Sequence, residues 1–255
     1  RRQRQMCIRD STTTASQKSH LTKASNKQVS SKQEYSRNSA KSSSLPDLRK
    51  YPSGTPRKKA FLRTVMPYIT SQNAAITAER NWLISKQYQG QWSPAERARL
   101  KDIAKRYKVK WSGNTRKIPW NTLLERVDII PTSMVATMAA AESGWGTSKL
   151  ARNNNNLFGM KCMKGRCTNA PGKVKGYSQF SSVKESVSAY VTNLNTHPAY
   201  SSFRKSRAQL RKADQEVTAT AMIHKLKGYS TKGKSYNNYL FAMYQDNQRL
   251  IAAHM

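Results

Sequence analysis

Apolar residues recur at helical spacing along the chain from residue 61 to residue 107. A first stripe predicts a long helix that runs to about residue 89, and its members are Phe61, Val65, Met66, Ile69, Ile76 and Leu83. Ser93-Pro94-Ala95-Glu96 then has the form of an N-cap, a first-turn proline and an acidic first turn. The helix after it carries its apolar face on Leu100, Ile103, Ala104 and Tyr107. Residues 61–119 are therefore predicted to form a helical support region.

The pattern from residue 120 onwards predicts helices on both sides of one irregular segment. Residues 158–180 alternate in short stretches among glycines and a proline, which is typical of a small β-hairpin lobe. Pro131 and Gly144 bound the first helix, and a capping box at Ser182-Val183-Lys184-Glu185 begins the second. A third helix is predicted over residues 207–227, ended by Gly228, and a fourth over residues 236–253. We expect a predominantly helical α+β fold.

The first 60 residues have a different composition. They hold 15 Lys and Arg against three acids, a net charge of +12, among repeated Ser, Thr, Gln and Asn. Such a segment offers too little apolar surface to offset the entropy lost on ordering, so we expect a disordered basic tail. Apolar residues are 37% of the whole chain, below the usual share of roughly 45–50%. The 255 residues carry 46 Lys and Arg against 13 Asp and Glu, a net charge of +33.

This charge predicts a polyanionic partner, and nucleic acid, anionic lipid and the bacterial cell wall all qualify. Nucleic-acid binding would need aromatic rings interleaved with the basic residues, and the tail offers just Tyr35 and Tyr51. No run of apolar residues is long enough for a membrane span or a signal peptide, so we expect a targeting segment upstream of Arg1. A nucleic-acid partner is not expected.

Cys162 and Cys167 could form a disulfide. If Lys164-Gly165 makes a two-residue hairpin turn, Cys162 faces Cys167 across the strands, close enough to bridge. Two unpaired thiols in a cytoplasmic loop are an equal alternative. Cys7 lies far away in the tail. The four histidines show no ligand-like spacing, so we expect no metal and no cofactor.

Glu142 differs in its setting from the other six carboxylates of residues 121–255. It follows Val135, Met138 and Ala139 at the i, i+3, i+4, i+7 positions of one helix face. A carboxyl group aimed where apolar residues point keeps its proton more readily, as a general acid requires. A solvent-facing residue at a helix end is the alternative. Ser143-Gly144-Trp145-Gly146 follows, and could turn the chain sharply while the indole borders a sugar-sized groove.

Two paired motifs resemble a known enzyme family. Ala141 to Gly146, followed by Asn155-Asn156-Leu157-Phe158-Gly159-Met160-Lys161, resembles the endo-β-N-acetylglucosaminidase family typified by the flagellar muralytic protein. The resemblance covers about residues 120–255, and the chain as a whole resembles an enterobacterial member of that family. It implies a lysozyme-like α+β fold with residues 120–255 as the catalytic domain, peptidoglycan as substrate and Glu142 as the catalytic acid.

The resemblance also implies roles for other residues. Gly228-Tyr229-Ser230-Thr231 and Tyr236 fit a C-terminal pattern in which a tyrosine lines the catalytic centre, a role that we transfer to Tyr236. Tyr229 would lie in the groove, although it could equally be a ring half-buried at a helix end, whereas for Tyr236 the catalytic role is favoured over that alternative. The expected substrate-binding residues are Trp145, Asn156, Phe158 and Tyr229.

A second carboxylate is missing from its usual place. Related enzymes commonly carry one in the hairpin, but residues 158–180 contain neither Asp nor Glu. Glu185 is the nearest candidate, yet its capping position already explains it. Otherwise the substrate's own 2-acetamido oxygen could attack the anomeric carbon.

Two classes of function follow. The first is a periplasmic or cell-envelope enzyme, expected to be a monomer, that cuts peptidoglycan after N-acetylglucosamine. A muramidase or lytic transglycosylase would use the same acid. The second is a wall-binding or, less expected, nucleic-acid-binding protein without turnover.

Overall fold

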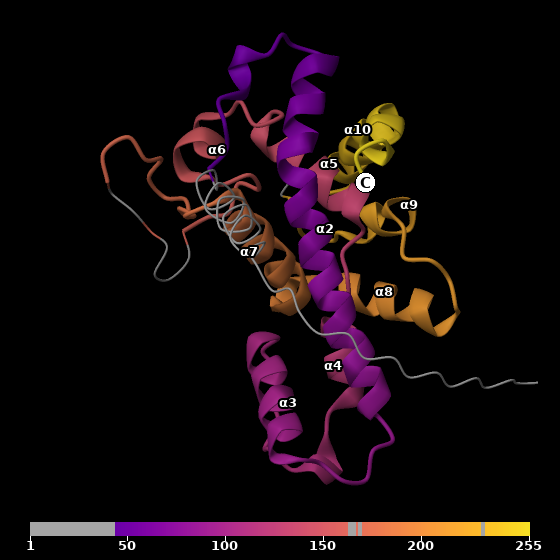
Figure 1. Ribbon diagram of the computed structural model, residues 1–255. Coiled ribbons are helices and arrows are strands. Elements are labelled where there is room, and N and C mark those ends of the chain that lie inside the picture. Colours follow the sequence, from indigo (N-terminus) through magenta and orange to yellow (C-terminus); the bar gives the residue numbers. More distant parts are fainter. Residues whose placement is uncertain (1–43, 163–166, 168–169, 231–232) are drawn as a thin grey trace, which may run out of the picture. The chain divides into compact units, whose positions relative to one another are not determined.

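The computed structural model describes residues 44–162, 167, 170–230 and 233–255. Over these residues the chain is predominantly helical, as predicted (Figure 1). The α-helices are α2 (Thr55–Lys86), α3 (Pro94–Arg106), α4 (Trp120–Arg126), α5 (Thr132–Ser143), α6 (Lys149–Asn154), α7 (Val183–Thr196), α8 (Ser201–Lys212), α9 (Ala219–Met222) and α10 (Lys234–Ala252). Short 3-10 helices are η1 (Leu48–Lys50), η2 (Thr115–Lys117), η3 (Pro198–Tyr200) and η4 (Ile223–Lys225). None of the described helices is long and apolar enough to cross a membrane.

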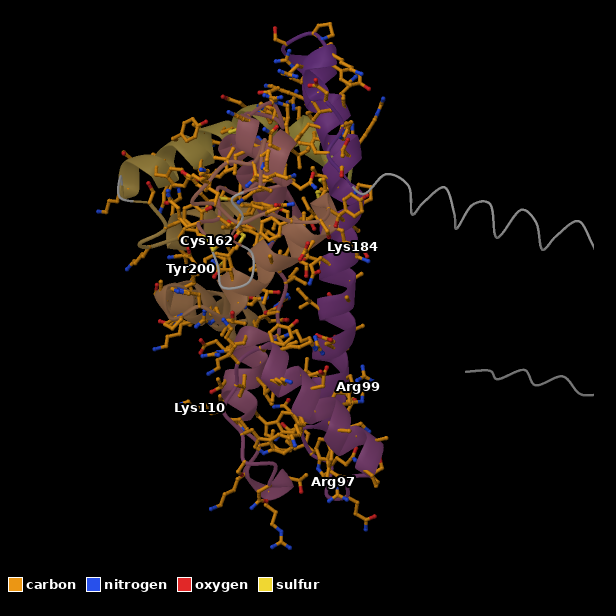
Figure 2. The ribbon with its side chains drawn as sticks, turned by 90° about the vertical axis from the view of Figure 1, so that its left-hand side faces the viewer. Arg97, Arg99, Lys110, Cys162, Lys184 and Tyr200 are labelled. Atoms are coloured by element: carbon orange, nitrogen blue, oxygen red, sulfur yellow. A yellow bond between two sulfur atoms is a disulfide. The ribbon has the colours of Figure 1, made fainter. Side chains whose placement is uncertain are left out.

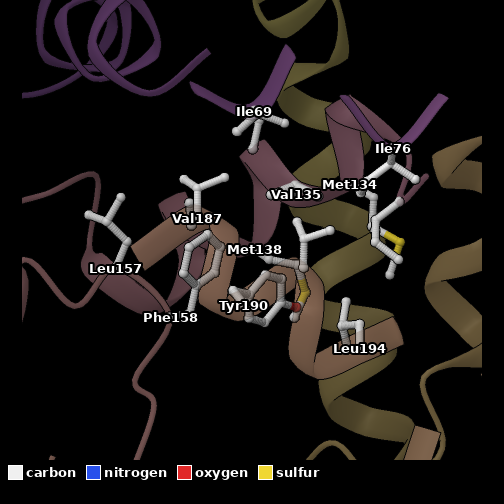
Figure 3. Packing of buried hydrophobic residues seen from close by; sticks show 14 of the residues in the cluster. Ile69, Ile76, Met134, Val135, Met138, Leu157, Phe158, Val187, Tyr190 and Leu194 are labelled. Carbon is white, nitrogen blue, oxygen red and sulfur yellow. The ribbon is translucent and has the colours of Figure 1, made fainter. Parts of the chain in front are cut away.

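Helix α5 lies at the centre of the core. It packs against α2 and α10, and its residues from Met134 to Ala140 are buried on every side. The predicted face of Val135, Met138 and Ala139 is therefore buried, but so is the opposite face. Helix α2 contributes a buried stripe and contacts both α5 and α7 (Figures 1 and 3). The predicted support region thus shares one apolar core with the predicted catalytic domain.

The folded unit begins earlier than residue 61. Helix α2 starts at Thr55, and Leu45 and Leu48 are buried in the common core. The Leu45 amide also donates to Asn155 Oδ1 at 3.1 Å, which ties this segment to a residue 110 positions away. The boundary predicted at residue 60 therefore differs from the structure. Residues 1–43 lie outside the described residues, so the disordered tail stays a prediction.

The local helix signals agree with the structure in most places. Ser93 and Glu96 form the reciprocal capping box of α3, and Gly144 ends α5 in the left-handed conformation with φ 57°. The single helix predicted over residues 207–227 is wrong. Helix α8 ends at Lys212, Asp214 takes a φ of 52°, and α9 starts anew with Thr218 as its N-cap.

The segment over residues 158–180 is held mainly by side-chain amides. Its described residues form two isolated antiparallel bridges, Lys161 with Tyr177 and Cys167 with Ser178, instead of a continuous ladder. The four consecutive asparagines all donate to main-chain oxygens in or beside it: Asn153 to Gly172, Asn154 to Val174, Asn155 to Phe180, and Asn156 to Met160 and Ser178. The predicted hairpin lobe is therefore not confirmed, and the asparagines do more than form a turn.

Candidate active site

Glu142 occupies the last turn of α5, immediately before a left-handed reversal of the chain. Gly144, Trp145 and Gly146 have φ values of 57°, 55° and 78°. The buried Ser143 hydroxyl donates to Ala139 O at 2.6 Å and accepts from the Gly146 amide at 2.8 Å, so it fastens the turn to the helix. The chain therefore reverses direction directly after the partly buried Glu142.

Trp145 does not lie where the sequence suggested. Its ring meets Phe61 of α2 edge to face at 5.6 Å between centroids, and Lys58 Nζ lies 5.1 Å from its centroid. The left-handed turn carries the indole to this side of α5, so Trp145 packs against α2 and is absent from the cleft lining described below. The predicted position beside the sugar groove is therefore not supported, and the ring instead joins the turn to α2.

Tyr236 contacts the carboxyl group of Glu142 directly. It lies in the first turn of α10, and its hydroxyl donates to Glu142 Oε1. Its ring stacks on that of Tyr229 with 5.5 Å between centroids and 23° between planes. Burial raises the pKa of both phenols above the ordinary value, and the neighbouring Glu142 carboxylate adds to the effect. Tyr236 is therefore a neutral donor at physiological pH.

Phe158 and Gly159 form the other side of the acid's surroundings. The Phe158 ring stacks on Tyr190 of α7 with 3.9 Å between centroids and 2° between planes (Figure 3). Gly159 has a φ of 63°, and a Cβ added there would lie 3.3 Å from Glu142 Oε2. A side chain at this position would therefore crowd the oxygen that Tyr236 leaves free.

Asn156 is a framework residue in this structure. It is 1% exposed, donates to Met160 O and Ser178 O, and accepts from the Met160 amide at 3.0 Å. These bonds hold the loop that contains Gly159. Asn156 is absent from the cleft lining, so the predicted direct contact with substrate is not supported.

The Glu142 carboxyl group lies at a cleft of about 1020 Å³. The cleft lining includes Glu142, Phe158, Gly159, Tyr229 and Tyr236, and α7 contributes residues along its length. Of the predicted catalytic and substrate-binding residues, the structure thus brings four together: Glu142, Phe158, Tyr229 and Tyr236. Figure 2 labels Cys162 and Tyr200, which also line the cleft.

Sequence reasoning missed several lining residues, among them Lys108, Tyr190, His197 and Tyr200. Tyr200 lies 6.2 Å from Tyr229 between ring centroids, and Tyr190 lies 6.5 Å from it. The density of tyrosines near the C-terminal motif was the available signal. Nothing in the sequence indicated that Lys108, which follows the end of α3, lines the same cleft as Glu142.

Among the described residues, the carboxylates that line the cleft are Glu142 and Glu185. Glu185 Oε2 accepts from the amide and the hydroxyl of Ser181, at 2.7 and 2.8 Å. Its own amide donates to Ser182 Oγ at 3.1 Å. The predicted cap is thus present, with Ser181 in place of Ser182 as the donor to the carboxylate. Asp128 is buried and pairs with Arg211 at 3.0 Å, so it holds the fold together.

Cys162 and Cys167 are joined by a disulfide, with 5.1 Å between their Cα atoms. Of the two alternatives that the sequence left open, the structure has the bridged pair. No group of three or more potential metal ligands occurs in the described part of the chain.

Residues 119–249 match the glucosaminidase family, described as mannosyl-glycoprotein endo-beta-N-acetylglucosaminidase. The match spans half of the chain, and the protein belongs to this family, as its motifs predicted. Its domain is that of a glycoside hydrolase and indicates a peptidoglycan hydrolase.

The similarity to one curated protein extends over nearly the whole chain. Over 244 residues the sequence is 97% identical to protein bax of Escherichia coli (strain K12), which covers 96% of this chain and 89% of that protein. No solved structure matches the chain.

Proposed function

We propose that the protein hydrolyses the β-1,4 glycosidic bond after N-acetylglucosamine in peptidoglycan, with Glu142 as the general acid. The observation that carries this proposal is the position of the Glu142 carboxyl group. It lies in a cleft walled by aromatic rings, one oxygen accepts from Tyr236, and the other faces the space that Gly159 leaves open. Aromatic walls suit a sugar ring, whose faces are apolar.

Tyr236 is a positioning residue in this scheme. Its hydroxyl donates to Oε1, which directs the remaining oxygen, Oε2, towards the Gly159 side of the cleft. A general acid must be within hydrogen-bond reach of the oxygen that it protonates, so a fixed carboxyl orientation raises the rate. The stacked Tyr229 ring holds Tyr236 in place from one side.

The second catalytic group is proposed to come from the substrate. Glu185 is engaged with Ser181 at the start of α7, which leaves Glu142 as the cleft carboxylate suited to chemistry. The acetamido oxygen of N-acetylglucosamine would bond to the anomeric carbon as Glu142 protonates the departing oxygen. Water would then add to the same carbon, giving its proton to the Glu142 carboxylate and reopening the ring intermediate. This sequence retains the anomeric configuration.

We further propose a periplasmic or cell-envelope location. The disulfide between Cys162 and Cys167 supports it, because such bonds persist in oxidising compartments. The net charge of +33 supports it too, since the basic tail would be attracted to the anionic wall, and salt would weaken that attraction.

The test is a comparison of two matched carboxamide variants, Glu142→Gln and Glu185→Gln, on purified peptidoglycan. Glu142→Gln removes the transferable proton and is expected to abolish muropeptide release. Glu185→Gln keeps an oxygen that can accept from Ser181 and is expected to retain activity within about tenfold, as befits a cap worth about 1 kcal/mol. Equal muropeptide release by wild type and Glu142→Gln would overturn the proposal. Loss of release in Glu185→Gln alone would identify Glu185 of α7 as the general acid instead.

A further inference from the structure

The helical region before residue 119 contributes one residue to the lining of the cleft, Lys108. The cleft continues along α7 towards it. Ser188 and Thr192, one turn apart on α7, line both this cleft and a smaller pocket of about 220 Å³ formed with Glu79, Arg106 and Tyr107. The region that the sequence suggested as mere support therefore borders the substrate path.

Lys108 occupies a backbone position that favours glycine. It follows the end of α3 with a φ of 55°. The Val109 amide donates to Ala104 O at 2.8 Å and the Lys108 amide to Lys105 O at 3.1 Å, which is the bonding pattern of a Schellman motif. The left-handed residue of such a motif is usually glycine, because a side chain there carries a conformational cost. A lysine held at this position points to a use for its ammonium group.

The backbone that carries Lys108 is fixed from outside α3. Arg126 Nη1 donates to Tyr107 O at 3.0 Å and to Lys108 O at 2.8 Å. Tyr107 is buried, and its hydroxyl donates to Glu79 at 3.1 Å. The base of the lysine side chain is therefore held between α2 and α4, while the residue itself is exposed.

The Lys108 ammonium has no ion-pair partner among the described residues. The other cleft lysine, Lys161, donates to Tyr177 Oη at 3.0 Å and lies over the Tyr177 ring at 4.2 Å from its centroid. Glu142 and Glu185 lie in the same cleft, so it carries acids along part of its length and an unpaired cation at the α3 wall. That cation suits an anionic group of a bound ligand.

We propose that Lys108 binds a carboxylate of the peptide stems that branch from alternate sugars of the glycan strand. This inference rests on the proposed function. The glycan backbone itself is uncharged, so the carboxylates of a peptidoglycan strand come from its stems. The enzyme would thereby prefer strands with free stem carboxylates over strands whose stem carboxylates have been converted to amides.

The experiment compares wild type, Lys108→Gly and Lys110→Ala on two substrates, intact glycan strands and the same strands with their stem carboxylates converted to methylamides by carbodiimide coupling with methylamine. Glycine suits the left-handed position, so Lys108→Gly is expected to melt no lower than wild type. Its KM for intact strands should rise about two- to fivefold, as expected for an exposed ion pair, with no change on the amidated strands. Lys110, an exposed cation outside the cleft lining, is the matched control and should change neither (Figure 2).

Each outcome has a distinct meaning. A rise confined to intact strands, which Lys108→Arg reverses, supports the proposal. Kinetics of Lys108→Gly equal to wild type on both substrates overturn it, and so does an equal loss on both, which would make Lys108 a sugar contact or a wall of the cleft. If wild type cuts neither substrate, the proposed function itself fails, and this inference fails with it.

Discussion

Removal of the Tyr236 hydroxyl isolates the contact between α10 and the proposed acid. In Tyr236→Phe the ring keeps its stack on Tyr229, but Glu142 Oε1 loses its donor. We expect kcat to fall while KM changes little, because the ring that borders the cleft remains. The carboxyl group would then sample orientations in which Oε2 no longer faces the substrate oxygen.

The size of the loss follows from the kind of bond removed. A hydrogen bond to a group that is charged for part of the cycle contributes about 1.5–3 kcal/mol. At about 1.4 kcal/mol for each factor of ten, this corresponds to a fall in kcat of roughly 10- to 150-fold. The half-buried position of Tyr236 favours the lower part of that range.

The assay is the rate of reducing-end release from purified glycan strands, measured over a range of substrate concentrations. Tyr239→Phe is the matched control, because this ring lies 6.4 Å from that of Tyr236, is 55% exposed and is absent from the cleft lining. It should retain wild-type kinetics. A kcat of Tyr236→Phe within twofold of wild type would refute the positioning role.

Two further predictions concern the folded state. Gly146→Ala should lower the free energy of unfolding, measured by urea titration, by about 2–5 kcal/mol. The reason is that φ is 78° at this position and the new Cβ would lie 2.7 Å from Leu48 Cδ1. A loss below about 0.5 kcal/mol would contradict this packing. Burial raises the pKa of Tyr190, Tyr229 and Tyr236 above the ordinary 10.0. As the pH rises, the phenols therefore ionise in the unfolded chain before they ionise in the folded protein. Their contribution to the free energy of unfolding should be constant up to about pH 9 and fall as the pH rises above about 10. An unchanged urea midpoint at about pH 11 would contradict the burial.

Features fixed by neighbouring residues could be predicted from the sequence. The cap of α3 needs only Ser93 and Glu96, and the end of α5 needs only Gly144, so a short window contains the whole signal. Glu142 was identified in the same way, from its position on α5 and the motif after it. Its proximity to Tyr236, 94 positions later, came from the family resemblance and not from periodicity.

Features that depend on distant contacts were missed or misplaced. Trp145 lies within the same motif as Glu142, but three left-handed residues turn its ring towards Phe61 of α2. Leu48 stands in a polar stretch with too few apolar neighbours to signal burial, yet it packs against Gly146. Lys108 reaches the cleft because the end of α3 and helix α7 border a common pocket, an arrangement that no local pattern in the sequence indicates.

The central claim is tested most directly by the identity of the new reducing end. Peptidoglycan digested by wild type and by Glu142→Gln is reduced with borohydride, and the released fragments are analysed by mass spectrometry. The account predicts fragments ending in reduced N-acetylglucosamine from wild type and none from Glu142→Gln. Fragments ending in reduced or anhydro muramic acid, or equal release by both proteins, would contradict it.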